Sequence, residues 1–204
     1  MTHTATEKDQ DTAECRKAAS RWFAGLLEYR GHALPDCIRS QVFAFFEAYG
    51  LWAERLGPKP KGLIVFGPIG AGKTTLCEDL VEAMRLCPRT ERVVILRARR
   101  MAEDYAQFDD YISWLRRVGQ ADVFLDDLGA ERNASRFGVP WSMADYLDDR
   151  YIAWREHQRI TLITTNLTGL SEISERYGHR AESRIREMLT PIVYAHPDRR
   201  PSWE

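Results

Sequence analysis

The sequence Gly-Pro-Ile-Gly-Ala-Gly-Lys-Thr at residues 67–74 constrains this chain more than any other feature. Its glycines allow the backbone to turn tightly and to point successive N–H groups at a phosphate. The apolar residues 63–66 before it predict a strand. Residues 74–86 after it predict a helix, whose positive N-terminal end favours an anion. A chance glycine-rich turn would lack this context, so the sequence predicts a phosphate-binding loop.

We expect this loop to bind the phosphates of ATP. Lys73 should reach the β- and γ-phosphates, Thr74 should ligate Mg²⁺ through its hydroxyl, and Thr75 can hold the α-phosphate. The predicted nucleotide-binding residues are Gly67, Pro68, Ile69, Gly70, Ala71, Gly72, Lys73, Thr74 and Thr75.

Short apolar runs alternate with longer amphipathic segments from the loop strand onward. The runs are residues 63–66, 93–96, 122–125, 160–164 and 192–195. Continuously apolar strands joined by helices are typical of a parallel sheet that is covered on both faces. We therefore expect an α/β sandwich with about five strands.

A second carboxylate site follows the strand at residues 122–125, where Asp126 and Asp127 stand next to each other. Mg²⁺ prefers oxygen ligands, and a strand tip beside the phosphates would supply them. We expect Asp126 to contact Mg²⁺ directly or from the second coordination sphere, and Asp127 to polarise the attacking water as general base. The alternative is a solvated acidic turn.

Asn166 ends the next apolar strand. Its amide could orient a water near the γ-phosphate, or it could simply cap a turn.

The region before the loop predicts a small helical part. Residues 1–12 predict a disordered polar tail, residues 13–56 two helices, residues 57–62 a Gly-Pro linker and residues 63–204 the ATPase domain. The aromatic residues of the helices could dock a protein partner, or they could cover one face of the sheet. These aromatics are Trp22, Phe23, Phe45, Phe46, Tyr49 and Trp52.

Composition excludes several classes. Lys plus Arg (29) nearly balance Asp plus Glu (30), and a net charge of -1 argues against a protein that coats nucleic acid, although not against a local basic strip. The four cysteines have neither CxxC nor zinc-ligand spacing, so we expect reduced thiols. No apolar run is as long as a membrane span, and the first residues do not resemble a signal peptide. We therefore expect a cytoplasmic protein with no membrane partner.

The sequence resembles the AAA+ ATPases, and within them the DnaC/DnaI-type helicase loaders and their IstB-type relatives. The resemblance lies in GPIGAGKTTL (67–76), VFLDDLGAE (123–131), YLDDRYIAWREHQRITLITTNL (146–167) and GHRAESRIREML (178–189). It implies an AAA+ fold, ATP hydrolysis with Mg²⁺, and self-association with ATP.

The resemblance also implies roles for individual residues. Asn166 would be the sensor 1 residue, and Arg184 would be an arginine finger that reaches the ATP of a neighbouring subunit. Arg150 matches an arginine that these relatives often carry before the sensor strand. The alternative for Arg184 is a pair with Glu182 or Glu187 on one helix face, worth a few tenths of a kcal/mol.

Residues 97–120 combine arginines with aromatic residues, and the loader relatives use an extra helix in this place to touch single-stranded DNA. Arginines and aromatic rings together can follow phosphates and stack bases. The alternative is an ordinary helix whose core face is Tyr111, Trp114, Leu115 and Val118.

The leading hypothesis is an ATP-switched, DnaC-like loader that acts on a replicative helicase. The alternatives are an IstB-like transposition or phage-encoded targeting ATPase, a P-loop kinase of small metabolites, and a module that binds ATP without turnover. Sensor 1 and Arg184 argue against the kinase, whereas Asp126, Asp127 and Asn166 argue against the inactive module.

Overall fold

The computed structural model describes Leu34, residues 36–85 and residues 93–194. Two compact units divide these residues. One unit contains helix α2 (Asp36–Ala53) and the part of α3 (Lys73–Arg85) from Glu78 onward; the other contains the rest from Lys61. The predicted tail and the first predicted helix, with Trp22 and Phe23, lie outside the described residues.

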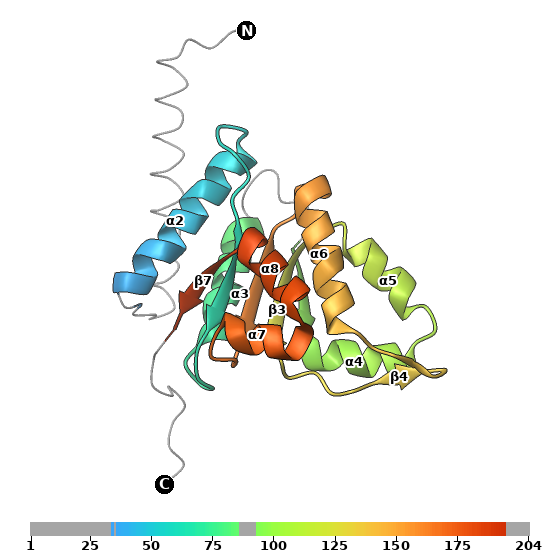
Figure 1. Cartoon of the computed structure of the whole chain (residues 1–204). Coiled ribbons are helices and arrows are strands. Elements are labelled where there is room, and N and C mark those ends of the chain that lie inside the picture. The colour runs from blue at the N-terminus through green and yellow to red at the C-terminus, as the bar shows by residue number, and fades with distance from the viewer. Residues whose placement is uncertain (1–33, 35, 86–92, 195–204) are drawn as a thin grey trace, which may run out of the picture. The chain divides into compact units, whose positions relative to one another are not determined.

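A parallel sheet of five strands forms the centre of the second unit, with strand order β2-β3-β6-β1-β7 (Figure 1). Its strands are β1 (Gly62–Phe66), β2 (Val93–Arg97), β3 (Asp122–Leu128), β6 (Thr161–Thr165) and β7 (Leu189–Val193). All residues of β1 and β6 are buried, as a parallel sheet covered on both faces requires. The predicted three-layer α/β class is confirmed.

The strand order places the predicted site residues together. Strand β6 lies between β1 and β3, and all three run in the same direction. Their carboxyl ends therefore meet at one edge of the sheet, where ligands of open α/β sheets bind. That edge receives the loop after β1, the acidic end of β3 and the residue that follows β6.

The last strand lies earlier in the sequence than the apolar run at residues 192–195 predicts. Strand β7 includes Pro191, which pairs in register with Ile64 of β1. Proline lacks an N–H donor, but β7 is the outer strand of the sheet, where one missing donor is tolerated. The apolar pattern alone missed Leu189 because helix α8 leads into the strand without a turn.

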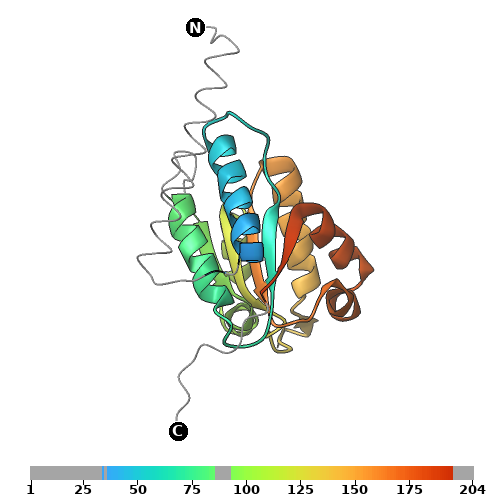
Figure 2. The same ribbon diagram turned by 90° about the vertical axis from the view of Figure 1, so that its left-hand side faces the viewer.

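Helices α4 (Ala98–Gln107), α5 (Tyr111–Val118), α6 (Met143–His157), α7 (Leu170–Tyr177) and α8 (His179–Met188) share one hydrophobic core with the sheet. Alternate strand residues such as Ile64, Val123 and Ile163 contribute to this core, which places these helices on one face. Figures 1 and 2 show α7 beside α8, and α8 packs against α6. A short hairpin of β4 (Ser135–Arg136) and β5 (Val139–Pro140), absent from the sequence-based prediction, precedes α6.

Arg150 of α6 is fully buried and binds the ends of several elements. Its Nε donates to Thr161 Oγ1 (3.1 Å), and Nη2 donates to Ile160 O (3.2 Å). Its Nη1 donates to Gly119 O (2.9 Å) and Ala121 O (3.2 Å). The side chain therefore joins α6 to the segments that enter β3 and β6, which is a structural role.

Helix α2 confirms the expectation of a helix after residue 35, and most of its aromatic side chains are buried. Phe45, Phe46, Tyr49 and Trp52 are buried, which fits the alternative that they pack within the chain. Docking of a partner by residues 13–56 stays a prediction. Within the helix, the Tyr49 ring packs against those of Phe45 and Trp52, with ring centroids 6.0 Å and 5.4 Å away. The predicted linker at residues 57–62 differs from the structure at Gly62, which already belongs to β1.

We predict that Arg150→Met lowers the free energy of unfolding by about 3 kcal/mol, because it leaves buried carbonyl groups without a donor. Arg155→Met on the exposed side of α6 is the matched control and should change stability little. Urea unfolding followed by circular dichroism measures both. Equal stability of the two variants would contradict the structural role of Arg150.

Candidate functional site

The loop between β1 and α3 has the backbone that its glycines permit. Gly72 adopts φ 95° immediately before α3 begins at Lys73, a conformation that residues with a Cβ rarely adopt. Gly67 lies so close to the backbone that follows β7 that a Cβ on Gly67 would be 2.3 Å from Tyr194 O. The structure thus places residues 67–72 in a tight turn that leads directly into the N-terminus of a helix.

Lys73 lies at the centre of this loop and is almost fully buried. Its Nζ donates to Gly67 O (2.9 Å), to Pro68 O (2.8 Å) and to Asn166 Oδ1 (2.8 Å). The third contact joins the loop to the end of β6. Two residues that the sequence assigned to one site are therefore in direct contact, although they are far apart in the chain.

Asp126 connects three elements through one carboxylate oxygen. Its Oδ1 accepts hydrogen bonds from Thr74 Oγ1 of α3 (2.8 Å) and from Thr164 Oγ1 of β6 (2.7 Å). The side chain is 5% exposed. Thr74 and Asp126, the two predicted magnesium ligands, are thus within hydrogen-bond distance of each other and offer only oxygen atoms, which suits this hard cation.

Asp127 follows in an irregular part of β3. The register between β3 and β6 shifts between Leu125 and Leu128, and Asp127 has a positive φ of 56°. Its N–H donates to Thr164 Oγ1 (2.9 Å), and Asn166 Nδ2 donates to its Oδ1 (3.4 Å). Bulges of this kind redirect side chains beside active sites. Here the carboxylates of the two adjacent aspartates contact different residues, because only that of Asp127 accepts from Asn166.

Thr164 is a site residue to which the sequence assigned no role. It donates to Asp126 and accepts from the N–H of Asp127, so it fixes both groups. The signal was present, because Thr164 stands in the Thr-Thr-Asn sequence at the end of β6. Among the described residues, no group of three or more His, Cys, Asp or Glu side chains could hold a metal ion.

Arg184 on α8 makes a different contact from the one predicted for it within the chain. It forms an ion pair with Asp148 of α6, and its guanidinium lies over the Tyr151 ring at 5.1 Å. Arg180 pairs with the same carboxylate at 3.2 Å. The alternative partners Glu182 and Glu187 are therefore wrong, because Asp148 lies nearer across the α6–α8 contact. The predicted role in a neighbouring subunit stays a prediction.

Some of the arginines and aromatic residues at 97–120 have partners within the chain, and others, such as Phe108, are exposed. Arg99 and Arg100 pair with acidic residues of their own helix, α4. Tyr111, Leu115 and Val118 of α5 are buried, as the core-face alternative requires, whereas Trp114 is partly exposed. Contact of this segment with single-stranded DNA stays a prediction.

A groove of about 590 Å³ lies between α5, the β4–β5 hairpin and α6. Its walls include Ile112, Trp141, Asp145 and His157. None of the residues predicted to bind nucleotide lines this groove.

The described residues include no helix of the length and apolar character that crossing a membrane needs.

Solved structures with similar folds are related only distantly in sequence. DnaI superposes with a TM-score of 0.62 and 24% identity over 82% of this chain and 87% of that one. The DnaC helicase loader gives 0.56 and 20% over 79% and 92%. The chain has a DnaC/DnaI-type AAA+ fold. AMPPCP-bound DnaA from Aquifex aeolicus shares this AAA+ fold, with a TM-score of 0.53 and 17% identity over 78% and 48%.

No family model matches the sequence, and no curated protein matches it.

Proposed function

We propose that the chain binds Mg²⁺–ATP at residues 67–75 and hydrolyses it to ADP and phosphate. The observation that carries the proposal is the 2.8 Å hydrogen bond from Thr74 to Asp126. It brings the first turn of α3 to the acidic end of β3, beside the Lys73 ammonium group. A hydroxyl, a carboxylate and a cation at one helix N-terminus are the groups that Mg²⁺ and a triphosphate require.

Each residue has a defined part in the proposed reaction. Lys73 would hold the β- and γ-phosphates, and Thr74 with Asp126 would hold Mg²⁺, which when bound neutralises charge on the phosphate oxygens. Asp127 would accept the proton of the attacking water. Asn166 contacts both Lys73 and Asp127, so its amide would orient that water between them.

We also propose a role as a helicase loader in DNA replication, with a replicative helicase as the protein partner. The similarity to DnaI and to the DnaC helicase loader supports it. A kinase would need an acceptor for the phosphoryl group, so release of phosphate without an acceptor distinguishes hydrolysis from that alternative.

Substitution of Lys73 tests the nucleotide site. Lys73→Ala should abolish binding of ATP in a fluorescence titration, because the buried ammonium is the charge beside the loop. Asp127→Asn should keep the binding affinity and slow hydrolysis at least tenfold, because it removes the base. Asparagine tolerates the positive φ at this position, so the fold should survive. Unchanged affinity in Lys73→Ala would contradict the site.

The proposed role of Arg184 in a neighbouring subunit predicts complementation. Arg184→Ala and Lys73→Ala should each lack ATPase activity, since arginine fingers are worth a factor of about 10³–10⁵ in rate. A mixture should recover activity, because each chain supplies what the other lacks. Arg180→Ala, which loses a pair with the same Asp148, is the control for effects on helix packing. A mixture that associates and stays inactive would refute the role.

The loader role predicts a nucleotide-dependent complex. With the purified replicative helicase of the source organism, the native chain should co-sediment in MgATP, and Lys73→Ala should not. Samples without nucleotide are the control. Absence of a complex in every nucleotide state would remove the loader role while leaving the ATPase proposal intact.

A further inference from the structure

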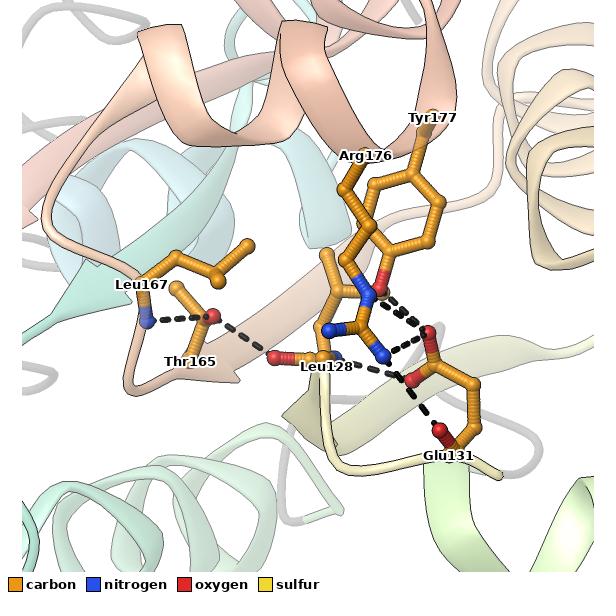
Figure 3. A network of polar contacts seen from close by, with 7 residues as sticks. Leu128, Glu131, Thr165, Leu167, Arg176 and Tyr177 are labelled. Atoms are coloured by element: carbon orange, nitrogen blue, oxygen red, sulfur yellow. Dashed lines mark hydrogen bonds and ion pairs between the residues drawn. The ribbon is translucent and has the colours of Figure 1, made fainter. Parts of the chain in front are cut away.

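The turn after β3 is fastened to helix α7 by Glu131 (Figure 3). Its side chain is 7% exposed. Oε2 accepts from the N–H of Gly129 (2.9 Å), and Oε1 accepts from the Tyr177 hydroxyl and from Arg176 Nε (3.3 Å). The backbone carbonyl of Glu131 accepts from Arg176 Nη2 (3.3 Å). A buried carboxylate needs such donors, and most of these come from the last two residues of α7.

The same turn is fastened to β6 on its other side. Thr165 Oγ1 donates to Leu128 O (2.7 Å) and accepts from the N–H of Leu167 (3.1 Å). Figure 3 shows these contacts on the side of the turn away from Arg176 and Tyr177. Asn166 stands between Thr165 and Leu167 in the sequence. The end of β6 and the turn after β3 are therefore held as one polar network.

The turn has little freedom to absorb movement. Asp127 and Gly129 both have positive φ values, 56° and 100°. The N–H of Ala130 donates to Asp127 O (2.9 Å), which closes the turn between the proposed base and Glu131. A displacement of the Asp127 backbone should thus reach Glu131, and through it α7.

Helix α7 is in turn packed against α8, which packs against α6. Arg184, the proposed finger, is on α8 and pairs with Asp148 of α6. Burial and the hydrogen bond to Glu131 raise the pKa of Tyr177 from its ordinary value, so its hydroxyl remains a donor at neutral pH. The contacts therefore run without a break from Asp127 to the helix that carries Arg184.

We propose that Glu131 and Tyr177 are positioning residues that couple the Asp127–Asn166 site to the α7–α8 surface. The inference rests on the proposed function for its catalytic part. The pair would keep the Asp127 carboxylate at the angle that hydrolysis needs. It would also transmit a change at that carboxylate to α8, the helix that carries Arg184.

The test compares Glu131→Gln, Tyr177→Phe and the double variant with the native chain. Each single variant should keep the affinity for ATP within about twofold and lower kcat by about tenfold, because small displacements of a catalytic group are costly. The double variant should be no slower than the single ones, since residues that act as a unit are not additive. Additive losses, or an unchanged kcat, would overturn the coupling.

Exposed Glu175 on α7 supplies the matched control, Glu175→Gln, which should behave as native. Unfolding midpoints of all variants separate a loss of stability from a loss of coupling. A structural role alone would lower the midpoint and leave kcat of the folded fraction unchanged.

A second measurement needs no nucleotide. In Tyr177→Phe, hydrogen exchange should become faster at the N–H groups of Asp127 and Ala130, which do not contact Tyr177. Unchanged exchange there would overturn the link even if the chain hydrolyses ATP. If the native chain neither binds nor hydrolyses ATP, the proposed function fails, and this exchange experiment still decides the link.

Discussion

One carboxylate oxygen holds the carboxyl edge of the sheet together. Asp126 Oδ1 accepts from the hydroxyls of Thr74 and Thr164, which belong to a helix and a strand that the chain reaches 52 residues before and 38 residues after it. Removal of this buried acceptor would leave two hydroxyls without their acceptor and would remove one of the links between the start of α3 and the strand ends. The arrangement of Lys73 and Asn166 depends on that same closure.

The two edges of the sheet carry polar groups for different purposes. At the carboxyl edge, the side chains offer oxygens and one ammonium group that can exchange partners with a ligand. At the amino edge, Arg150 and Asp122 are buried and bind backbone groups of the segments that enter β3 and β6. The second set can only hold the strands in place. This division explains how one sheet can be rigid and still present reactive groups.

Sequence reasoning predicted the position of candidate site residues where each directly follows an apolar strand. The loop at residues 67–74, the acidic end of β3 and Asn166 each stand at the end of an apolar run, so topology alone brings them together. It failed where a role depends on a partner remote in sequence. Asp148 under Arg184, and Tyr177 against Glu131, join elements whose packing no local pattern specifies. The predicted last strand began too late, because α8 leads into β7 without a turn and Pro191 interrupts the apolar pattern.

Gly67 shows that a motif can record architecture as well as chemistry. The carbonyl of Tyr194, which follows β7, lies where a side chain at position 67 would have to be. The N–H of Tyr194 also donates to Phe66 O (2.7 Å), so these two backbone segments are held together and cannot move apart to make room. A descendant that lost all use for nucleotide would still need glycine here. The presence of the first glycine of such a motif is therefore weak evidence of nucleotide binding, and the presence of the lysine near its end is stronger evidence.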